Sequence, residues 1–185
     1  DISEYYVAYQ SAALVYGAVS QLPQALMVAT PRQHRPVRLG DAAIIFVQVQ
    51  RVKFFGSEEV RYHDALFAIS NREKTLLDCL DRYDLCGGID EVAQTITRLL
   101  PEINTERLLA YAARMNNRAL IQRLGFILQE ISTDPPATAL LDGLTALVSP
   151  RVYLLDPHGP TPGAIDPRWR VRHNIALTQD LTQEM

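Results

Sequence analysis

The sequence has few of the features that cross-link a protein covalently or anchor it in a membrane. Its 185 residues include only two cysteines and one tryptophan, and they contain no run of 18 apolar residues. A disulfide-rich scaffold and a transmembrane helix are therefore not expected. We interpret Cys79 and Cys86 as reduced thiols of a cytoplasmic protein, with a disulfide between them as the alternative.

The sequence also lacks the short motifs of enzyme chemistry. It contains no Walker phosphate loop and no GxGxxG, GxSxG, HExxH or CxxC pattern. Its four histidines are far apart and fall in predicted loops or at strand ends; they are His34, His63, His158 and His173. We therefore expect no metal, no cofactor and no catalytic residue in this chain.

What is present is the composition of an ordinary globular domain. Hydrophobic residues make up 48% and charged residues 21% of the chain, values typical of soluble domains. The net charge of −3 argues against a surface built as a whole for nucleic acid. Because the sequence begins with Asp1 and has no signal peptide, we expect it to be a fragment of a longer protein.

The first third of the chain is predicted to form a short helix followed by strands. Residues 11–17 are small and apolar and end in a glycine, as a compact helix does. In the strand predicted at 42–50, alternation places Ile45, Val47 and Val49 on a buried face. Phe46, Gln48 and Gln50 fall on the opposite face, which is predicted to be in contact with solvent for most of its length. The other predicted strands lie between turn signals at Gly40-Asp41 and His63-Asp64, and cover residues 25–29, 36–39, 59–62 and 66–69.

The remaining chain is predicted to be mostly helical. Ser70 and Glu73 form a capping box, in which each side chain bonds to the backbone amide of the other. Helical periodicity follows over residues 70–82, 89–100, 104–115, 118–131 and 139–148, and two strands follow over 152–155 and 168–171. The order indicates an α+β fold: a small mixed or antiparallel sheet, built from the N-terminal third and the C-terminal strands, packed on about five to six helices. Residues 1–175 form one domain in this interpretation, and 176–185 a polar tail.

Three acids in the middle of the chain could suggest a metal site. Asp78 and Asp81 are one helical turn apart, Asp84 follows the helix, and Arg82 lies among them. We interpret this group as a solvated helix face with ion pairs.

One enzymatic alternative stays open, a nuclease-like fold that is active or has lost its metal site. Such a site needs an Asp and then an acid-x-Lys sequence on a strand. Asp41 precedes the strand at 42–50, but the neutral amides of Gln48 and Gln50 stand where the acid and lysine are required. Amides hold Mg²⁺ and activate water poorly. The segment Glu59-Val60-Arg61 is the nearest substitute, with arginine in place of lysine.

Two basic clusters stand out against the acidic total. The first lies on a loop that leads into a strand and contains Arg32, His34, Arg35 and Arg38. The second lies on the last predicted strand, where alternation places Arg168, Arg170 and Arg172 on one face and Trp169 on the other. A row of guanidinium groups suits phosphates or an acidic protein surface. The six arginines are our candidate contacts to nucleic acid or a partner, and an edge strand protected by charge is the alternative.

Several stretches together resemble the antitoxin domain of AbiEi-type transcriptional regulators, which belong to type IV (abortive-infection) toxin–antitoxin systems. The resemblance runs from about residue 5 to about residue 175. Its most characteristic part is Phe54-Phe55-Gly56, followed by Arg72 to Arg82 and Asp84 to Ile89; further parts are residues 11–17 and 21–30, Tyr111 to Asn117, Arg123-Leu124-Gly125, and Arg168 to Val171 with Asn174.

This resemblance implies a non-enzymatic antitoxin domain. Such regulators carry an N-terminal winged-helix domain that binds operator DNA, and a C-terminal domain that counters a nucleotidyltransferase-like toxin. We expect the present chain to be the antitoxin part, to assist autorepression, and to meet the operator mainly through the missing domain. The resemblance assigns no catalytic residue.

Overall fold

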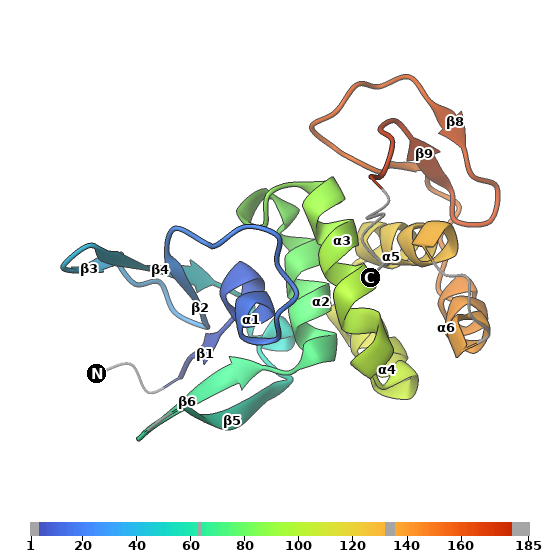
Figure 1. The fold of residues 1–185 in the computed structure, drawn as a ribbon. Coiled ribbons are helices and arrows are strands. Elements are labelled where there is room, and N and C mark those ends of the chain that lie inside the picture. Colours follow the sequence, from blue (N-terminus) through green and yellow to red (C-terminus); the bar gives the residue numbers. More distant parts are fainter. Residues whose placement is uncertain (1–3, 63, 132–135, 179–185) are drawn as a thin grey trace, which may run out of the picture.

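The computed structural model describes residues 4–62, 64–131 and 136–178. Figure 1 shows a six-stranded sheet at one end of the molecule, a group of helices in the middle and a small three-stranded sheet at the other end. The predicted α+β class is confirmed. The C-terminal strands form a sheet of their own, however, and do not join the N-terminal strands as predicted.

The large sheet is mixed and has the strand order β3-β4-β2-β1-β6-β5. Both predicted hairpins are present: β3 pairs with β4 and β5 with β6, each in antiparallel register. The pairs β2–β4 and β1–β6 are parallel. The predicted turn residue His63 lies outside the described residues. The strands are β1 (Tyr6–Val7), β2 (Leu26–Thr30), β3 (Val37–Leu39), β4 (Ala42–Gln48), β5 (Ser57–Tyr62) and β6 (Ala65–Ser70).

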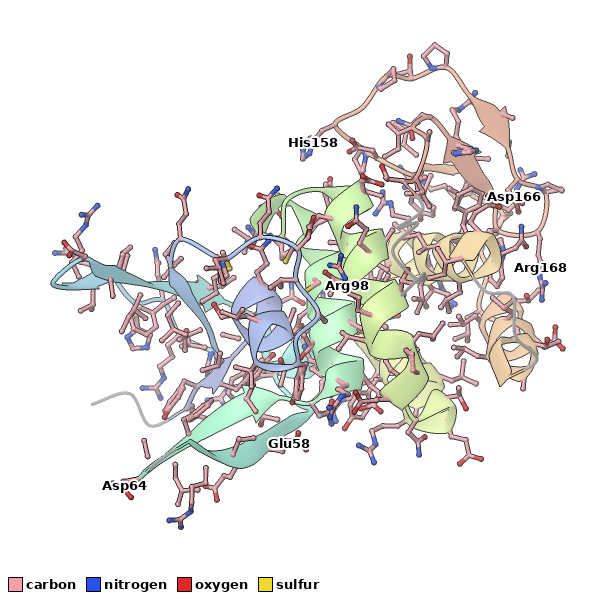
Figure 2. All side chains as sticks on the ribbon, viewed as in Figure 1. Glu58, Asp64, Arg98, His158, Asp166 and Arg168 are labelled. Carbon is pink, nitrogen blue, oxygen red and sulfur yellow. The ribbon has the colours of Figure 1, made fainter. Side chains whose placement is uncertain are left out.

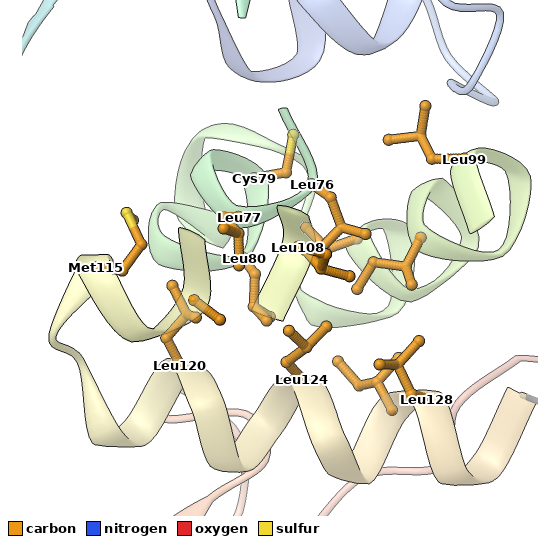
Figure 3. Packing of buried hydrophobic residues seen from close by; sticks show 14 of the residues in the cluster. Leu76, Leu77, Cys79, Leu80, Leu99, Leu108, Met115, Leu120, Leu124 and Leu128 are labelled. Atoms are coloured by element: carbon orange, nitrogen blue, oxygen red, sulfur yellow. The ribbon is translucent and has the colours of Figure 1, made fainter. Parts of the chain in front are cut away.

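Helix α2 (Arg72–Asp81) is at the centre of the molecule. It contacts four other helices, and Leu76, Leu77 and Leu80 are almost fully buried. Figure 3 shows these side chains packed against leucines of the neighbouring helices. The other helices are α1 (Tyr9–Val15), α3 (Ile89–Leu99), α4 (Thr105–Met115), α5 (Arg118–Ile131) and α6 (Pro136–Thr145), with short 3₁₀ turns at Arg51–Lys53, Tyr83–Leu85 and Leu100–Glu102.

The start of α2 differs from the predicted capping box. Ser70 is the last residue of β6, and Asn71 is the N-cap, whose side-chain oxygen accepts a hydrogen bond from the Lys74 amide at 3.0 Å. Glu73 does not bond back to the cap. Its carboxylate instead accepts from the backbone amide of Asn104 at 2.8 Å. The helix therefore begins one residue later than predicted, and Glu73 ties it to the start of α4.

The C-terminal segment contains β7 (Tyr153–Leu154), β8 (Ala164–Ile165) and β9 (Val171–His173). The predicted strand 168–171 is wrong over most of its length. Asp166 accepts from the Trp169 amide at 2.7 Å and the Arg170 amide donates to the Asp166 carbonyl at 2.9 Å. The chain therefore makes a turn over residues 166–170, and Arg170 has a φ of +55°. Trp169 is fully buried.

Candidate interaction surfaces

The polar side chains of α2 are used inside the protein. Lys74 is fully buried and pairs with Asp78 one turn further along the helix. The Tyr6 hydroxyl donates to the same carboxylate at 3.3 Å. The Lys74 ammonium also lies 5.0 Å from the centre of the Phe55 ring, within the range of a cation–π interaction. A ligand outside the protein cannot reach this group, so it stabilises the fold and offers no site.

The acids of the predicted solvated face are therefore only partly in solvent. Asp78 is buried, which corrects that interpretation. Asp81 pairs with Lys53 at 2.6 Å and accepts a hydrogen bond from Asn117 at 2.9 Å. Asp84 is half exposed and pairs with Arg82 at 2.8 Å. The predicted ion pairs are present, and both lysines of the chain serve in them.

Burial dominates the electrostatics of this region. It raises the pKa of Asp78, although the neighbouring Lys74 acts in the opposite direction. It also raises the pKa of Tyr6 and of Tyr9 well above 10. The pKa of Cys79 is raised as well, first by a hydrogen bond with the Cys86 thiol and then by burial. Both cysteines are free, as predicted, and both are buried, so Cys79 is held as an unreactive thiol.

Two glycines of the characteristic stretches are required by packing. A Cβ atom at Gly56, which has a φ of +73°, would lie 2.9 Å from Lys74 and Tyr111 side-chain atoms. A Cβ atom at Gly125 would lie 2.1 Å from the Trp169 ring. The ring therefore lies directly on the backbone of α5, and these residues fix the fold without forming a site.

No metal site is found among the described residues, where no three His, Cys, Asp or Glu side chains cluster suitably. The residues of the nuclease alternative are also kept apart. Asp41 lies in the turn before β4, and Glu59 lies on β5. Three strands separate β4 from β5, which corresponds to roughly 19 Å at the usual strand spacing. The geometry does not assemble the acid-x-Lys site.

The first basic cluster lies on open surface. We call Arg32, Arg35 and Arg38 the loop arginines; all three are exposed, on β3 and the segment before it. Within the described part of the chain, none of them forms an ion pair. Arg32 helps to lower the pKa of Glu4, after the larger effect of the hydrogen bond from Arg51. The ring of His34 packs 5.5 Å from that of Phe46. The loop arginines are thus exposed positive charges on the edge strand β3 and just before it, and no described acid holds any of them in an ion pair.

The second cluster is organised differently. We call Arg168, Arg170 and Arg172 the tail arginines; they do not form the predicted row, because only Arg172 belongs to a strand. Arg168 pairs with Asp142 of α6 at 2.9 Å, on the side of the molecule away from the large sheet (Figure 2). Arg170 donates to the Pro150 carbonyl at 3.3 Å, and Arg172 donates to the Gly163 carbonyl at 3.1 Å. Each tail arginine therefore holds a different segment of the C-terminal part.

Two features were not predicted from the sequence. Gln122, fully buried on α5, accepts from the Ser149 backbone amide at 2.9 Å and donates to the carbonyls of Arg151 and Trp169, each at 2.9 Å. Its position among apolar residues of a buried helix was the available signal. The second feature is an apolar groove on the large sheet, lined in part by Phe46. The strand face predicted to be wet at Phe46 is therefore apolar there.

Comparisons with known proteins agree with this description. The family model described as AbiEi antitoxin C-terminal domain matches residues 5–130. The fold is similar to the crystal structure of the RV2827C protein from Mycobacterium tuberculosis, with a TM-score of 0.62 and 14% sequence identity. The alignment covers 90% of this chain and 61% of that one, so the present chain spans about three fifths of its structural relative. None of the curated proteins matches the sequence. No helix in the described ranges is long and apolar enough to cross a membrane.

Proposed function

The chain belongs to the family of AbiEi antitoxin C-terminal domains, and on that premise we propose that it counters a nucleotidyltransferase-like toxin by binding an anionic partner and not by catalysing a reaction. Its role in a toxin–antitoxin system follows from the family. The class of the toxin and the absence of a reaction are our proposals. They are supported by how the polar residues of the chain are distributed.

The observation that carries the proposal is the contrast between the centre of the domain and its edge. The charged side chains of the characteristic stretch, Lys74 and Asp78, are buried and satisfied by each other. A catalytic group must reach its substrate, which these side chains cannot do. The loop arginines, in contrast, are exposed and pair with no acid in the described ranges. Unpaired guanidinium groups on a surface bind anionic partners.

We propose further that the full-length protein is a transcriptional regulator with a winged-helix domain ahead of this one. The description of the family as a C-terminal domain supports an N-terminal part, and the structural relative extends well beyond the aligned region. In this arrangement the N-terminal domain reads the operator. The loop arginines add phosphate contacts that assist autorepression, because phosphate contacts position a protein on DNA without reading its sequence.

The antitoxin role is tested by co-expression. Cells that express the toxin encoded beside this protein should stop growing, and co-expression of the 185-residue chain should restore growth. A toxin inactivated at its own active site serves as the control for expression burden. Growth arrest that persists while the chain accumulates in folded form would contradict the proposal.

The DNA contact is tested separately, in a binding assay at several salt concentrations. Replacing the three loop arginines by glutamine in the full-length protein should weaken operator binding and lower the salt slope, roughly by one for each phosphate that is no longer neutralised. A change in sequence preference is not expected. Unchanged affinity and slope would show that these arginines do not contact the operator. The same preparations, incubated with DNA or RNA and Mg²⁺, should show no cleavage, and metal-dependent cleavage would favour the nuclease alternative.

A further inference from the structure

An open apolar groove lies between α1 and the outer face of the large sheet. Its volume is about 560 Å³, and its lining is almost entirely apolar. Side chains of α1, β2, β4 and β6 form its walls and floor; among them are Leu14, Val15, Leu26, Ile44, Phe46 and Phe67. Strand register explains the floor, because Leu26 pairs with Ile44 and Val28 pairs with Phe46 on the same face of the sheet.

The groove gathers much of the exposed hydrophobic surface of the domain. Leu14, Val15 and Leu26 are 39%, 51% and 42% exposed, and Val37, cross-strand neighbour of Ile44, is 42% exposed. Single exposed hydrophobic residues are ordinary, but a contiguous apolar surface of this kind marks a site of contact with other protein. On the opposite face of the same sheet, Ala29 and Val47 are buried in the main core together with residues of α2. One face of the sheet is therefore covered by this domain, and part of the other is not.

We propose that this groove is covered in the full-length protein by the N-terminal part that precedes the domain. The inference rests on the proposed function only for the existence of that part, and not for its binding to DNA or for the antitoxin activity. Two observations support an occupant of this kind. The family model describes a C-terminal domain and begins to match at residue 5, and the structural relative contains a large further portion outside the alignment.

The groove lies next to the start of the family match, which also favours the N-terminal part as its occupant. Tyr5, the residue at which the family match begins, is itself part of the groove lining, and β1, which starts at the next residue, lies between β2 and β6 in the sheet. A domain attached directly before Tyr5 is therefore held next to the groove. Such tethering gives an effective concentration in the millimolar range for a short linker, so even a weak apolar contact is formed most of the time. A toxin or a second copy would have to reach the groove from solution.

The test measures how fast cysteines placed in the groove react with a maleimide. Leu26→Cys and Val15→Cys probe the floor and the α1 wall in separate variants. Ile165→Cys on β8 is the matched control, because Ile165 is 41% exposed at the other end of the molecule. The native cysteines are buried, so they stay unlabelled in every folded variant and report on folding. Each variant is made in the 185-residue chain and in the full-length protein, without toxin or DNA.

We expect both groove cysteines to react at least about tenfold more slowly in the full-length protein than in the 185-residue chain, because a covered groove would be open in at most about one molecule in ten. Ile165→Cys should react equally fast in both proteins. Equal rates at the groove positions would overturn the proposal. Protection that appears only when toxin is added would assign the groove to the toxin. Protection of the 185-residue chain that increases with its own concentration would assign it to a second copy. Because growth rescue is measured separately, a failure here leaves the antitoxin proposal standing.

Discussion

The buried ion pair of α2 gives the most demanding prediction. Lys74→Met leaves the Asp78 carboxylate buried beside the Tyr6 hydroxyl alone, and Asp78→Asn leaves the Lys74 ammonium without its counter-ion. The two side chains are 0% and 4% exposed, so water cannot replace the missing partner. Removing one member of such a pair costs about 3–5 kcal/mol. This is a large part of the roughly 5–15 kcal/mol that stabilises a typical domain.

The double variant Lys74→Met with Asp78→Asn should be more stable than either single variant. It contains no buried charge, and the amide introduced at position 78 can still accept a hydrogen bond from Tyr6. We expect a favourable coupling of about 2–3 kcal/mol between the two changes. At the usual ratio of about 2–4 °C per kcal/mol for a chain of this size, each single variant should lower Tm by about 6–20 °C.

The assay is guanidinium denaturation, followed by circular dichroism and by the fluorescence of Trp169, the only tryptophan. The matched control is the pair Lys53 and Asp81, whose side chains are 22% and 15% exposed. The same two substitutions there should cost less, since partial hydration compensates a missing partner. If the losses at Lys74 and Asp78 simply add in the double variant, the account of a buried pair is wrong.

Three further predictions follow from the core, the buried tyrosines and the tail. Leu77→Ala should lower the free energy of unfolding by about 2–5 kcal/mol in the same assay, because Leu77 is fully buried. The control Leu66→Ala, at a side chain that is 57% exposed, should change it by no more than about 0.5 kcal/mol. Burial raises the pKa of Tyr6 and Tyr9 above their usual value of 10; above pH 10 the unfolded chain therefore loses protons that the folded chain keeps, and stability should fall as pH rises. A spectrophotometric titration should show these two tyrosines ionising only with unfolding, and reversible ionisation of all eight together near pH 10 in folded protein would refute this. Replacing the tail arginines by glutamine should speed proteolysis between residues 156 and 163, because their hydrogen bonds to the Pro150 and Gly163 carbonyls are removed. The same change in the loop arginines should leave the rate of proteolysis there unchanged. If both variants resist proteolysis equally, the assigned contacts of the tail arginines are wrong.

Local patterns were enough to predict most of the helices. The α5 range was predicted without error, since its apolar periodicity is strong and uninterrupted. The range predicted at 104–115 begins with the cap of α4, Asn104, whose side chain accepts from the Arg107 amide at 2.9 Å. In both segments the interactions that decide the structure lie within a few residues of each other.

The errors occurred where distant residues compete with a local pattern. Glu73 fits a capping box, but the amide of Asn104, 31 residues away, takes its carboxylate. Asp78 fits a solvated face, but Tyr6, 72 residues away, helps to enclose it. The alternation of Arg168, Trp169 and Arg170 fits a strand, but Asp166 fixes a turn there so that the Trp169 ring can lie on Gly125. No local pattern contains these contacts.

The sequence was enough to identify the residues of the candidate interaction surfaces, but not how these residues are arranged in space. The loop arginines form a run without acids that the sequence displays directly, and their exposure is confirmed. Their role as contacts stays a prediction. The apolar groove was not predicted, because it depends on the strand register that places Ile44 beside Leu26 and on the position of α1, which forms one wall of the groove and leaves it open.

One growth assay tests the central claim most directly, namely that the exposed edge of this domain carries its function and the buried part of the characteristic stretch carries its fold. The toxin is co-expressed with two variants of the chain, one with the loop arginines replaced by glutamine and one with Lys74→Met and Asp78→Asn together. Both variants are first shown to be folded by circular dichroism. The account predicts that the arginine variant loses part or all of the growth rescue, while the double core variant rescues growth like the parent chain. Full rescue by the arginine variant, together with failed rescue by the folded core variant, would contradict it.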